Sequence, residues 1–214
     1  MPDLTETRFA SSPIVTTVFE QILTAVNDGS LLPGERVNDG ELAKQLGVSR
    51  TPVREAIQRL REIGVIEASA SRFTRVAEVT PLQTAQSYTV WLALYGALVD
   101  EVIPRVPDGL VEVLEADHAQ YLASLTTGDA QQIATANYLF FSRLPAESEN
   151  PALQRALTSV VHVVRLGSLH LPEFIDLAGV AHAQKLLIDA VRARDVSGAR
   201  TAMTVLGDIE VPQD

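Results

Sequence analysis

The stretch that decides the fold is residues 38–64, which read NDGELAKQLGVSRTPVREAIQRLREIG. Asn38 is suited to cap a helix, and Glu41 stands three residues later as the other half of a capping box. Gly47 stands where the end of that helix needs a left-handed residue. Gly64 ends a second run of helical periodicity. The stretch therefore predicts two short helices joined by a tight turn.

The second predicted helix has one apolar face and one basic face. Ser49 or Thr51 is suited to cap its start. Its apolar face carries Val53, Ile57 and Leu60, which are spaced i, i+4 and i+7. Its basic face carries Arg50, Arg54, Gln58 and Arg61. A helix that is buried on one side and basic on the other fits the DNA major groove, which is about 12 Å wide.

The polar side chains of this helix are suited to DNA. Arginine forks match a guanine edge or a phosphate, and Arg50 and Arg54 lie one turn apart. Ser49, Thr51 and the helix N-terminus are placed to bind phosphate through hydroxyl and N–H groups. The alternative is an amphipathic helix whose solvated arginines pair with glutamates of the same helix. The neighbouring elements favour DNA binding over that alternative.

The residues on either side complete a winged helix-turn-helix. Apolar residues at helical spacing predict a first helix that begins at Pro13. Two short β runs within residues 65–77 predict a hairpin, which is the wing. Arg72 and Arg75 lie on this wing and are predicted to reach a neighbouring groove of the DNA.

The rest of the chain is predicted to be helical only. Runs of helical periodicity are separated by Pro, Gly and Asp residues, and their inward positions are apolar. The predicted helices span about 81–103, 108–125, 129–145, 151–169, 173–194 and 195–206. Helices of this length form a bundle with its own core, so the fold class is mainly α. The expected parts are a flexible tail at 1–12, a winged helix-turn-helix DNA-binding domain at 13–78 and an all-helical effector-sensing and dimerisation domain at 79–214.

Charge is unevenly distributed along the chain. The 214 residues carry a net charge of −10, which by itself repels phosphates. Residues 50–75 nevertheless carry six arginines against three glutamates, and such a basic patch binds DNA in one orientation. The absence of cysteine excludes disulfides and a Cys-based zinc site. We recognise no secretory signal and no membrane-spanning run, so we expect a cytoplasmic protein without a membrane partner.

Two runs resemble a known family. The run ELAKQLGVSRTPVREAIQRLREIGVIE resembles the winged helix of the GntR family of bacterial transcription regulators, and VFEQILTAVNDGSLLPGERVN resembles its first helix and turn. The helical remainder resembles the sensor domain of the FadR-type subfamily, called the FCD domain, so the resemblance covers residues 14–206. It implies DNA-contacting roles for Ser49, Arg50, Thr51 and Arg54. The chain departs from the family at Gly40, where Arg is frequent, and at Ser71 and Phe73, where glycines are usual.

A second departure concerns metal binding. Many sensor domains of this kind hold a divalent metal with one Asp and three His. By resemblance those places fall on Asn137, Phe141, Gln184 and Leu206, which are weak ligands or none. The histidines of the chain are expected to be surface or hydrogen-bonded residues rather than a second metal site. We therefore predict no metal and no other cofactor.

The same places suggest an aromatic pocket in the bundle. The family often carries Arg and Glu where this chain has Trp91 and Tyr95, which are four residues apart and share a helix face. The aromatic side chains either line a dry pocket or fill it as plain core, and the sequence leaves both alternatives open. The candidate pocket residues are Trp91, Tyr95, Asn137, Phe141, His162, Arg165, Gln184 and Leu206.

The function predicted from these features is regulation of transcription. A homodimer is expected to bind a palindromic operator on double-stranded DNA, mainly as a repressor, and a small organic effector in the helical domain is expected to modulate that binding. The alternative is a DNA-binding regulator whose degenerate sensor domain serves only for dimerisation. An enzyme is the least favoured class, because no nucleophile–base pair, paired carboxylates or phosphate loop stands out.

Overall fold

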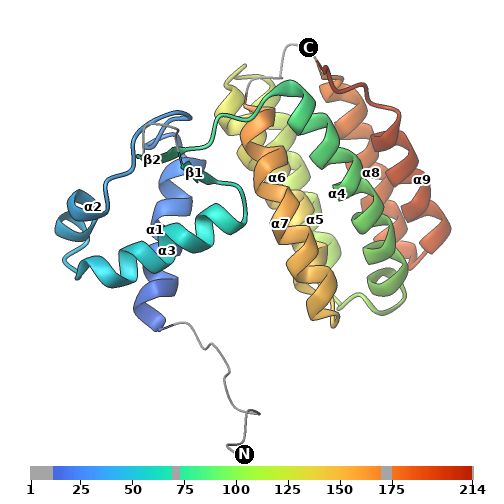
Figure 1. Cartoon of the computed structure of the whole chain (residues 1–214). Coiled ribbons are helices and arrows are strands. Elements are labelled where there is room, and N and C mark those ends of the chain that lie inside the picture. The colour runs from blue at the N-terminus through green and yellow to red at the C-terminus, as the bar shows by residue number, and fades with distance from the viewer. Residues whose placement is uncertain (1–11, 69–72, 170–174, 214) are drawn as a thin grey trace, which may run out of the picture. The chain divides into compact units, whose positions relative to one another are not determined.

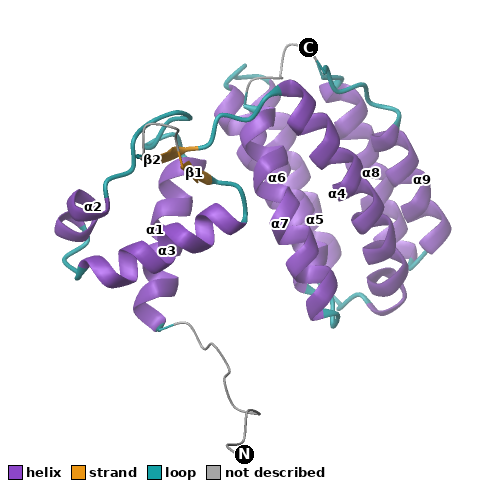
Figure 2. Cartoon of the chain, viewed as in Figure 1, coloured by secondary structure: helices purple, strands orange, loops and turns teal. Residues whose placement is uncertain are grey.

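The computed structural model describes residues 12–68, 73–169 and 175–213. The chain divides into two compact units, Met1–Ala77 and Glu78–Asp214 (Figure 1). Strands occur in the first unit, and the described part of the second unit is helical (Figure 2). The predicted tail, the tip of the wing and Arg72 lie outside the described residues. No helix among those described is long and apolar enough to cross a membrane.

The first unit is a winged helix-turn-helix, as the sequence predicts. Its elements are α1 (Pro13–Asn27), α2 (Asp39–Gln45), α3 (Arg50–Glu62), β1 (Ile66–Ala68) and β2 (Thr74–Val76). The two strands are antiparallel, with Ile66 opposite Val76. Asn38 caps α2, because its side chain accepts from the N–H groups of Gly40 and Glu41 at 2.9 and 3.3 Å. Gly47 adopts the predicted left-handed conformation, with φ of +66°.

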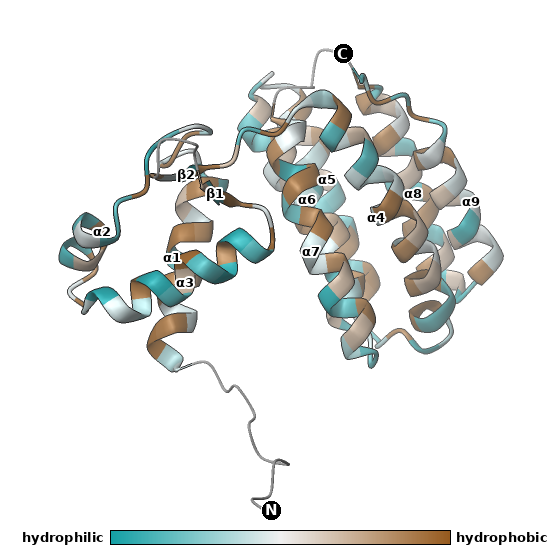
Figure 3. Ribbon diagram, in the orientation of Figure 1, coloured by the Kyte–Doolittle hydropathy of each residue, from teal (hydrophilic) through white to brown (hydrophobic). Residues whose placement is uncertain are grey.

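The core of the first unit lies between α1 and α3. The buried residues of α1 recur every three or four positions, and those of α3 include the three apolar residues expected from their spacing. They are Val15, Val18, Ile22 and Val26 on α1, and Pro52, Val53, Ala56, Ile57 and Leu60 on α3. Of this pair, α3 is the more hydrophilic helix (Figure 3), so one face of it remains available to solvent.

The second unit is a helical bundle with one continuous core. Its elements are α4 (Pro81–Val102), η1 (Ile103–Arg105), α5 (Leu110–Leu125), α6 (Ala130–Ala146), α7 (Pro151–Ser168), α8 (Leu177–Ala193) and α9 (Val196–Gly207). Helix α4 begins with a complete capping box, in which the side chains of Thr80 and Gln83 each accept from the backbone N–H of the other. Helix α8, which the sequence predicts to follow Pro172, begins at Leu177, and Asp176 caps it by accepting from the Gly179 N–H at 2.8 Å.

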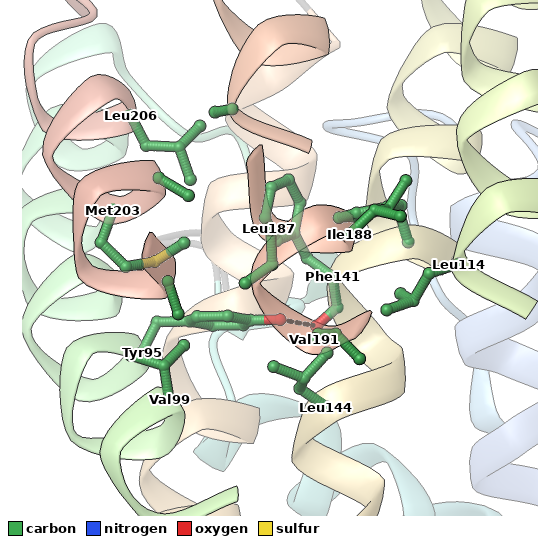
Figure 4. Close-up of a cluster of buried hydrophobic side chains, with 14 of the residues drawn as sticks. Tyr95, Val99, Leu114, Phe141, Leu144, Leu187, Ile188, Val191, Met203 and Leu206 are labelled. Atoms are coloured by element: carbon green, nitrogen blue, oxygen red, sulfur yellow. Dashed lines mark hydrogen bonds between the residues drawn. The ribbon is translucent and has the colours of Figure 1, made fainter. Parts of the chain in front are cut away.

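A tyrosine completes the hydrogen bonding of α6. Pro145 lies inside this helix and has no N–H, so the carbonyl of Phe141, four residues earlier, lacks its helical donor. The hydroxyl of Tyr95, which is fully buried on α4, donates to that carbonyl at 3.1 Å (Figure 4). Burial raises the pKa of Tyr95 well above its ordinary value. A hydroxyl from one helix therefore replaces the missing donor of another.

Helices α4 and α7 approach closely at Gly167. A Cβ placed on Gly167 would lie 1.8 Å from Oγ1 and 2.7 Å from Cβ of Thr84. Thr84 is itself buried and donates its hydroxyl to the Thr80 carbonyl at 3.0 Å. The spacing of the two helices therefore depends on the absence of a side chain at Gly167.

Candidate nucleic-acid interface and cavity of the helical unit

A polar hollow of about 760 Å³ lies in the first unit beside the exposed face of α3. Four arginines line it, together with two acidic residues of α2. The arginines are Arg36, Arg50, Arg54 and Arg61, and the acids are Asp39 and Glu41. A concave surface with this many guanidinium groups is suited to the phosphates and base edges of DNA.

Arg50 and Arg54 converge on one carboxylate at the start of α2. Nη2 of Arg50 donates to Oδ1 of Asp39 at 2.6 Å, and Nε of Arg54 donates to Oδ2 at 2.5 Å. The arginine side chains are 58% and 63% exposed, whereas that of Asp39 is 21% exposed. The hydrogen bonds from Arg54 and Arg50 lower the pKa of Asp39. Each guanidinium has five N–H donors, so each retains donors beyond the one that Asp39 accepts.

The other predicted residues of α3 also lie on its exposed side. Ser49 occupies the N-cap position, but its side chain makes no capping hydrogen bond, and Thr51 is exposed. Gln58 donates to Glu62 at 3.3 Å and accepts from Arg61 at 3.5 Å. The hydroxyl of Ser49 is therefore not committed to the helix, and the Gln58 amide lies among charged neighbours.

The wing differs from the expectation for Arg75. Its Nε donates to Oε1 of Glu67 at 2.6 Å, and the Arg75 side chain is only 30% exposed. The two residues are direct cross-strand partners in the register of the hairpin, where opposite charges attract. Arg75 is thus engaged within the wing rather than extended away from it.

The structure adds one arginine that the sequence analysis did not single out. The guanidinium of Arg36 lies 3.9 Å from the ring centroid of Phe73, in a cation–π contact. Arg36 also pairs with Arg75 in an isolated bridge of the backbone. The only signal in the sequence is Phe73 itself, which replaces a usual glycine. Because the two residues are far apart in the chain, that signal did not identify its partner.

Gly40 lies close to Arg50, one of the two recognition arginines. A Cβ on Gly40 would lie 3.3 Å from Oδ1 of Asn38 and 3.9 Å from the guanidinium carbon of Arg50. A longer side chain at this position would therefore enter the region next to Arg50. The arginine expected here from the family resemblance is therefore absent from the surface beside Arg50.

The helical unit contains a cavity of about 100 Å³. Five of the eight predicted pocket residues line it, namely Trp91, Asn137, Phe141, Arg165 and Leu206. Tyr88 and Tyr138 add aromatic surface, and the rings of Trp91 and Phe141 meet edge to face at 5.3 Å. The described lining is therefore mainly aromatic and aliphatic, with a few polar groups, which is typical of a site for a small organic molecule.

Three predicted pocket residues do not line this cavity. Tyr95 is turned toward the Phe141 carbonyl, as described above. Gln184 is fully buried behind Asn137, to which its Nε2 donates at 3.0 Å. His162 is buried beside the ring of Tyr138, with the ring centroids 6.1 Å apart. These side chains serve packing and hydrogen bonding rather than the lining.

A chain of hydrogen bonds lies at the place where related domains hold a metal. Nδ1 of His118 is 2.9 Å from Oε1 of Gln184, and Gln184 in turn donates to Asn137. The three polar side chains are therefore hydrogen-bonded in series, and two amides with one imidazole are a poor ligand set for a divalent metal. No group of three His, Asp or Glu residues suited to a metal occurs among the residues that the structure describes. The residues present do not fit a metal.

Arg165 brings a positive charge to the cavity. Its Nη2 donates to Oγ1 of Thr135 at 3.0 Å, and its guanidinium carbon lies 4.4 Å from the ring centroid of Tyr138. The residue is buried, and burial lowers the pKa of Arg165. A guanidinium fixed at the cavity wall is suited to orient a polar or anionic group of a bound molecule.

We predict that His162 makes the stability of the helical unit depend on pH. Burial, followed by the charge of Arg165, lowers the pKa of His162 to about 4 from its ordinary value of 6.5. The neutral imidazole therefore stabilises the folded state fully above pH 6.5, and this contribution is lost as the pH falls toward 4. Between pH 7 and pH 4.5 we expect a loss of about 2–3 kcal/mol in the free energy of unfolding.

The measurement is urea unfolding at several pH values, for the wild type and for His162→Phe. Carboxyl groups titrate in both proteins, so the difference between the two pH profiles isolates the imidazole. Parallel profiles would show that His162 does not cause the effect.

Comparison with known proteins identifies the family. The family described as bacterial regulatory proteins, gntR family, matches residues 14–76, and the FCD domain matches residues 86–207. The chain is 30% identical to the HTH-type transcriptional regulator McbR of Escherichia coli (strain K12). The aligned 179 residues cover 80% of this chain and 79% of that protein. It is 26% identical to a probable D-xylose utilization operon transcriptional repressor of Paenarthrobacter nicotinovorans, over 94% of this chain and 89% of the relative.

The fold agrees with this identification. The solved structure of E. coli McbR/YncC is similar to this chain with a TM-score of 0.74 and 24% identity, and the match covers 92% of this chain and 94% of that one. The predicted fold class and family resemblance are therefore confirmed. The chain belongs to the GntR family: it is a DNA-binding transcription regulator, not an enzyme, and its helical domain is an FCD domain.

Proposed function

We propose that this regulator reads its operator with the exposed face of α3, and that a small organic effector in the cavity of the FCD domain modulates the binding. The observation that carries the first part is the pair Arg50 and Arg54, which are more than half exposed and lie side by side over Asp39. The apolar residues on the opposite face of α3 are buried, so core packing fixes the backbone positions of Arg50 and Arg54.

The surroundings of this pair support contact with both bases and phosphates. The hollow adds Arg36 and Arg61, and Ser49 has a hydroxyl that makes no capping bond. Arginine forks contact guanine edges, whereas hydroxyl groups and helix N-termini contact phosphates. We therefore propose that Arg50 and Arg54 read the bases. Contacts that position the protein on the DNA backbone are assigned to Ser49, Thr51, Gln58, Arg36 and Arg61.

We expect Arg50→Ala and Arg54→Ala each to weaken operator binding by about 1–3 kcal/mol, because each would remove a bidentate base contact. The operator is first selected from random duplexes, and fluorescence anisotropy at fixed salt then gives its affinity. Arg200→Ala is the matched control, since Arg200 is an equally exposed arginine paired with Asp100 in the helical domain. Unchanged operator affinity in both Arg50→Ala and Arg54→Ala would contradict the assignment.

A homodimer fits this mode of reading. Each chain supplies one recognition helix, and two-fold proteins bind two-fold operators. We further propose that the protein is a cytoplasmic repressor, since it acts on the chromosome and the relative from P. nicotinovorans is named a probable repressor. Light scattering of the free protein and of its operator complex measures the stoichiometry.

The cavity suggests the kind of effector. Its volume of about 100 Å³ is somewhat below that of an engineered cavity of about 150 Å³ that binds benzene. Aromatic and aliphatic side chains make up most of the lining, and Arg165 and Asn137 are suited to make polar contacts. A small ring or branched carbon skeleton with one carboxylate or other polar group therefore matches the lining.

We expect a compound of this class to raise the melting temperature of the protein and to change its affinity for the operator. A thermal-shift screen of small aromatic and branched aliphatic acids tests this expectation. Val164→Phe places a ring in the cavity, since Val164 lines it, and should abolish the shift while operator binding by the free protein remains. A screen without any stabilising compound would instead favour the alternative of a domain used only for dimerisation.

One observation favours that alternative. The amides of Asn137 and Gln184 are hydrogen-bonded to each other, and Gln184 also pairs with His118. Polar groups that could hold an effector are thus partly committed within the bundle. The screen and the Val164→Phe variant decide between the two functions.

A further inference from the structure

Asp39 stands out in the hollow because its carboxylate is shared by both recognition arginines. Each of its oxygens accepts one hydrogen bond, Oδ1 from Arg50 and Oδ2 from Arg54. The three side chains come from two helices joined by the tight turn at Gly47. The short acidic side chain is therefore a fixed point on α2 to which two long side chains of α3 are tied.

The geometry places the acid beneath the arginines rather than beside them. The side chain of Asp39 is 21% exposed, and those of Arg50 and Arg54 are 58% and 63% exposed. Asp39 is the first residue of α2, directly after the Asn38 cap. A carboxylate in this position holds one N–H of each guanidinium group and leaves the others available, because both arginine side chains are more than half exposed.

Two physical consequences follow for DNA binding. A free arginine side chain loses much rotamer entropy when it is fixed on a base, and fixing it beforehand reduces that loss. The carboxylate also adds a negative charge to a surface that attracts phosphates, which weakens binding to DNA of any sequence. The first effect strengthens specific binding alone, whereas the second weakens specific and non-specific binding alike, so only the first changes the ratio of the two affinities.

We propose that Asp39 is a specificity-determining positioning residue: it holds Arg50 and Arg54 as a pair for the base edges of the operator and lowers affinity for other DNA. The inference rests on the proposed function, in which these two arginines read the operator. It predicts that Asp39 raises the ratio of operator affinity to non-operator affinity, and does not merely change both affinities by the same factor.

The test measures affinities for the operator and for a scrambled duplex of equal length, at several salt concentrations. The variants are Asp39→Ala, Asp39→Asn and the control Glu41→Ala. Glu41 lines the same hollow, and its substitution removes the same charge without removing a bond to either arginine. We expect Asp39→Ala to reduce the operator-to-scrambled ratio by roughly 5- to 30-fold, the order set by the ordering of two arginine side chains.

The control should behave differently. Glu41→Ala should raise both affinities in proportion and leave the ratio unchanged, because only charge is lost. Asp39→Asn keeps an acceptor oxygen and should give a smaller decrease of the ratio than Asp39→Ala. It also decides the question if Asp39→Ala does not fold, since asparagine at the start of α2 preserves the size of the side chain.

The combination with Arg54→Ala distinguishes positioning from a structural role. In the Arg54→Ala background, Asp39→Ala should change the ratio by less, because one of its two partners is already gone. A ratio in the Asp39 variants equal to that of Glu41→Ala would overturn the inference while leaving the proposed function intact. Unchanged operator affinity in Arg50→Ala and Arg54→Ala would instead overturn the proposed function itself.

Discussion

Tyr95→Ala is expected to lower the free energy of unfolding of the FCD domain by about 3–5 kcal/mol, the range for removing a buried aromatic ring. Tyr95 is fully buried, and its ring lies 4.6 Å from that of Trp91 and 5.6 Å from that of Phe141 between centroids. The substitution removes these contacts and also leaves the Phe141 carbonyl without its donor. Urea unfolding followed by the fluorescence of Trp91, the only tryptophan of the chain, measures the loss.

The hydroxyl can be examined separately. Tyr95→Phe keeps the ring and should cost about 1–3 kcal/mol, because a buried carbonyl is left unsatisfied. In the background of Pro145→Ala the cost should be smaller, since an alanine N–H reaches the Phe141 carbonyl from within α6. A smaller cost of Tyr95→Phe in the Pro145→Ala background, measured in a double-mutant cycle, would show that the Tyr95 hydroxyl compensates for the N–H that Pro145 lacks.

Tyr121 provides the control for this cycle. It is also buried and donates its hydroxyl to a backbone carbonyl, that of Leu177 at 3.2 Å. Leu177 begins α8, where a helical N–H also reaches its carbonyl. Pro145→Ala should therefore leave the cost of Tyr121→Phe unchanged. An equal cost of Tyr95→Phe in both backgrounds would disprove the role assigned to its hydroxyl.

Gly167→Ala is expected to destabilise the same domain by about 3 kcal/mol, the upper end of the usual range for overpacking. Rotation of the Thr84 side chain would relieve the contact of 1.8 Å with Oγ1, but the contact of 2.7 Å with Thr84 Cβ remains. Helices α4 and α7 must therefore separate. The opposing gain in helix propensity from Gly to Ala is only about 1 kcal/mol.

Gly96→Ala is the matched control for this prediction. Gly96 lies within α4, and a Cβ there would meet no atom within 4 Å. The same exchange should therefore stabilise the protein by about 0.5–1 kcal/mol. Urea unfolding of the two variants beside the wild type should give changes of opposite sign. A stabilised Gly167→Ala protein would show that the two helices do not need this close approach.

The fold could be predicted because its determinants are local. The turn at Gly47, the cap at Asn38 and the apolar spacing of α3 each act over a few residues. The outward direction of Arg50 and Arg54 follows from the same spacing. Their common partner does not, because Asp39 is 11 and 15 residues earlier in the chain. The turn alone determines that these three side chains meet.

The contacts that the sequence did not reveal have the same origin. Alternation along β2 places Arg75 on the wing, but only the register of the hairpin shows that Glu67 faces it. The four-residue spacing puts Tyr95 on the face of Trp91, yet its hydroxyl is directed by a proline on another helix. Five of the pocket residues line the cavity, and resemblance to the family locates four of them, all except Arg165. The burial of Gln184 behind Asn137 depends on packing among helices.

The missing side chain at Gly40 has a consequence for how relatives of this regulator diverge. A side chain there would lie beside Arg50 and would need only a slight movement of Asn38. One substitution at this position therefore alters the surface that meets DNA, while the buried scaffold stays unchanged. A duplicated copy with a larger residue at this position is therefore expected to prefer a different operator.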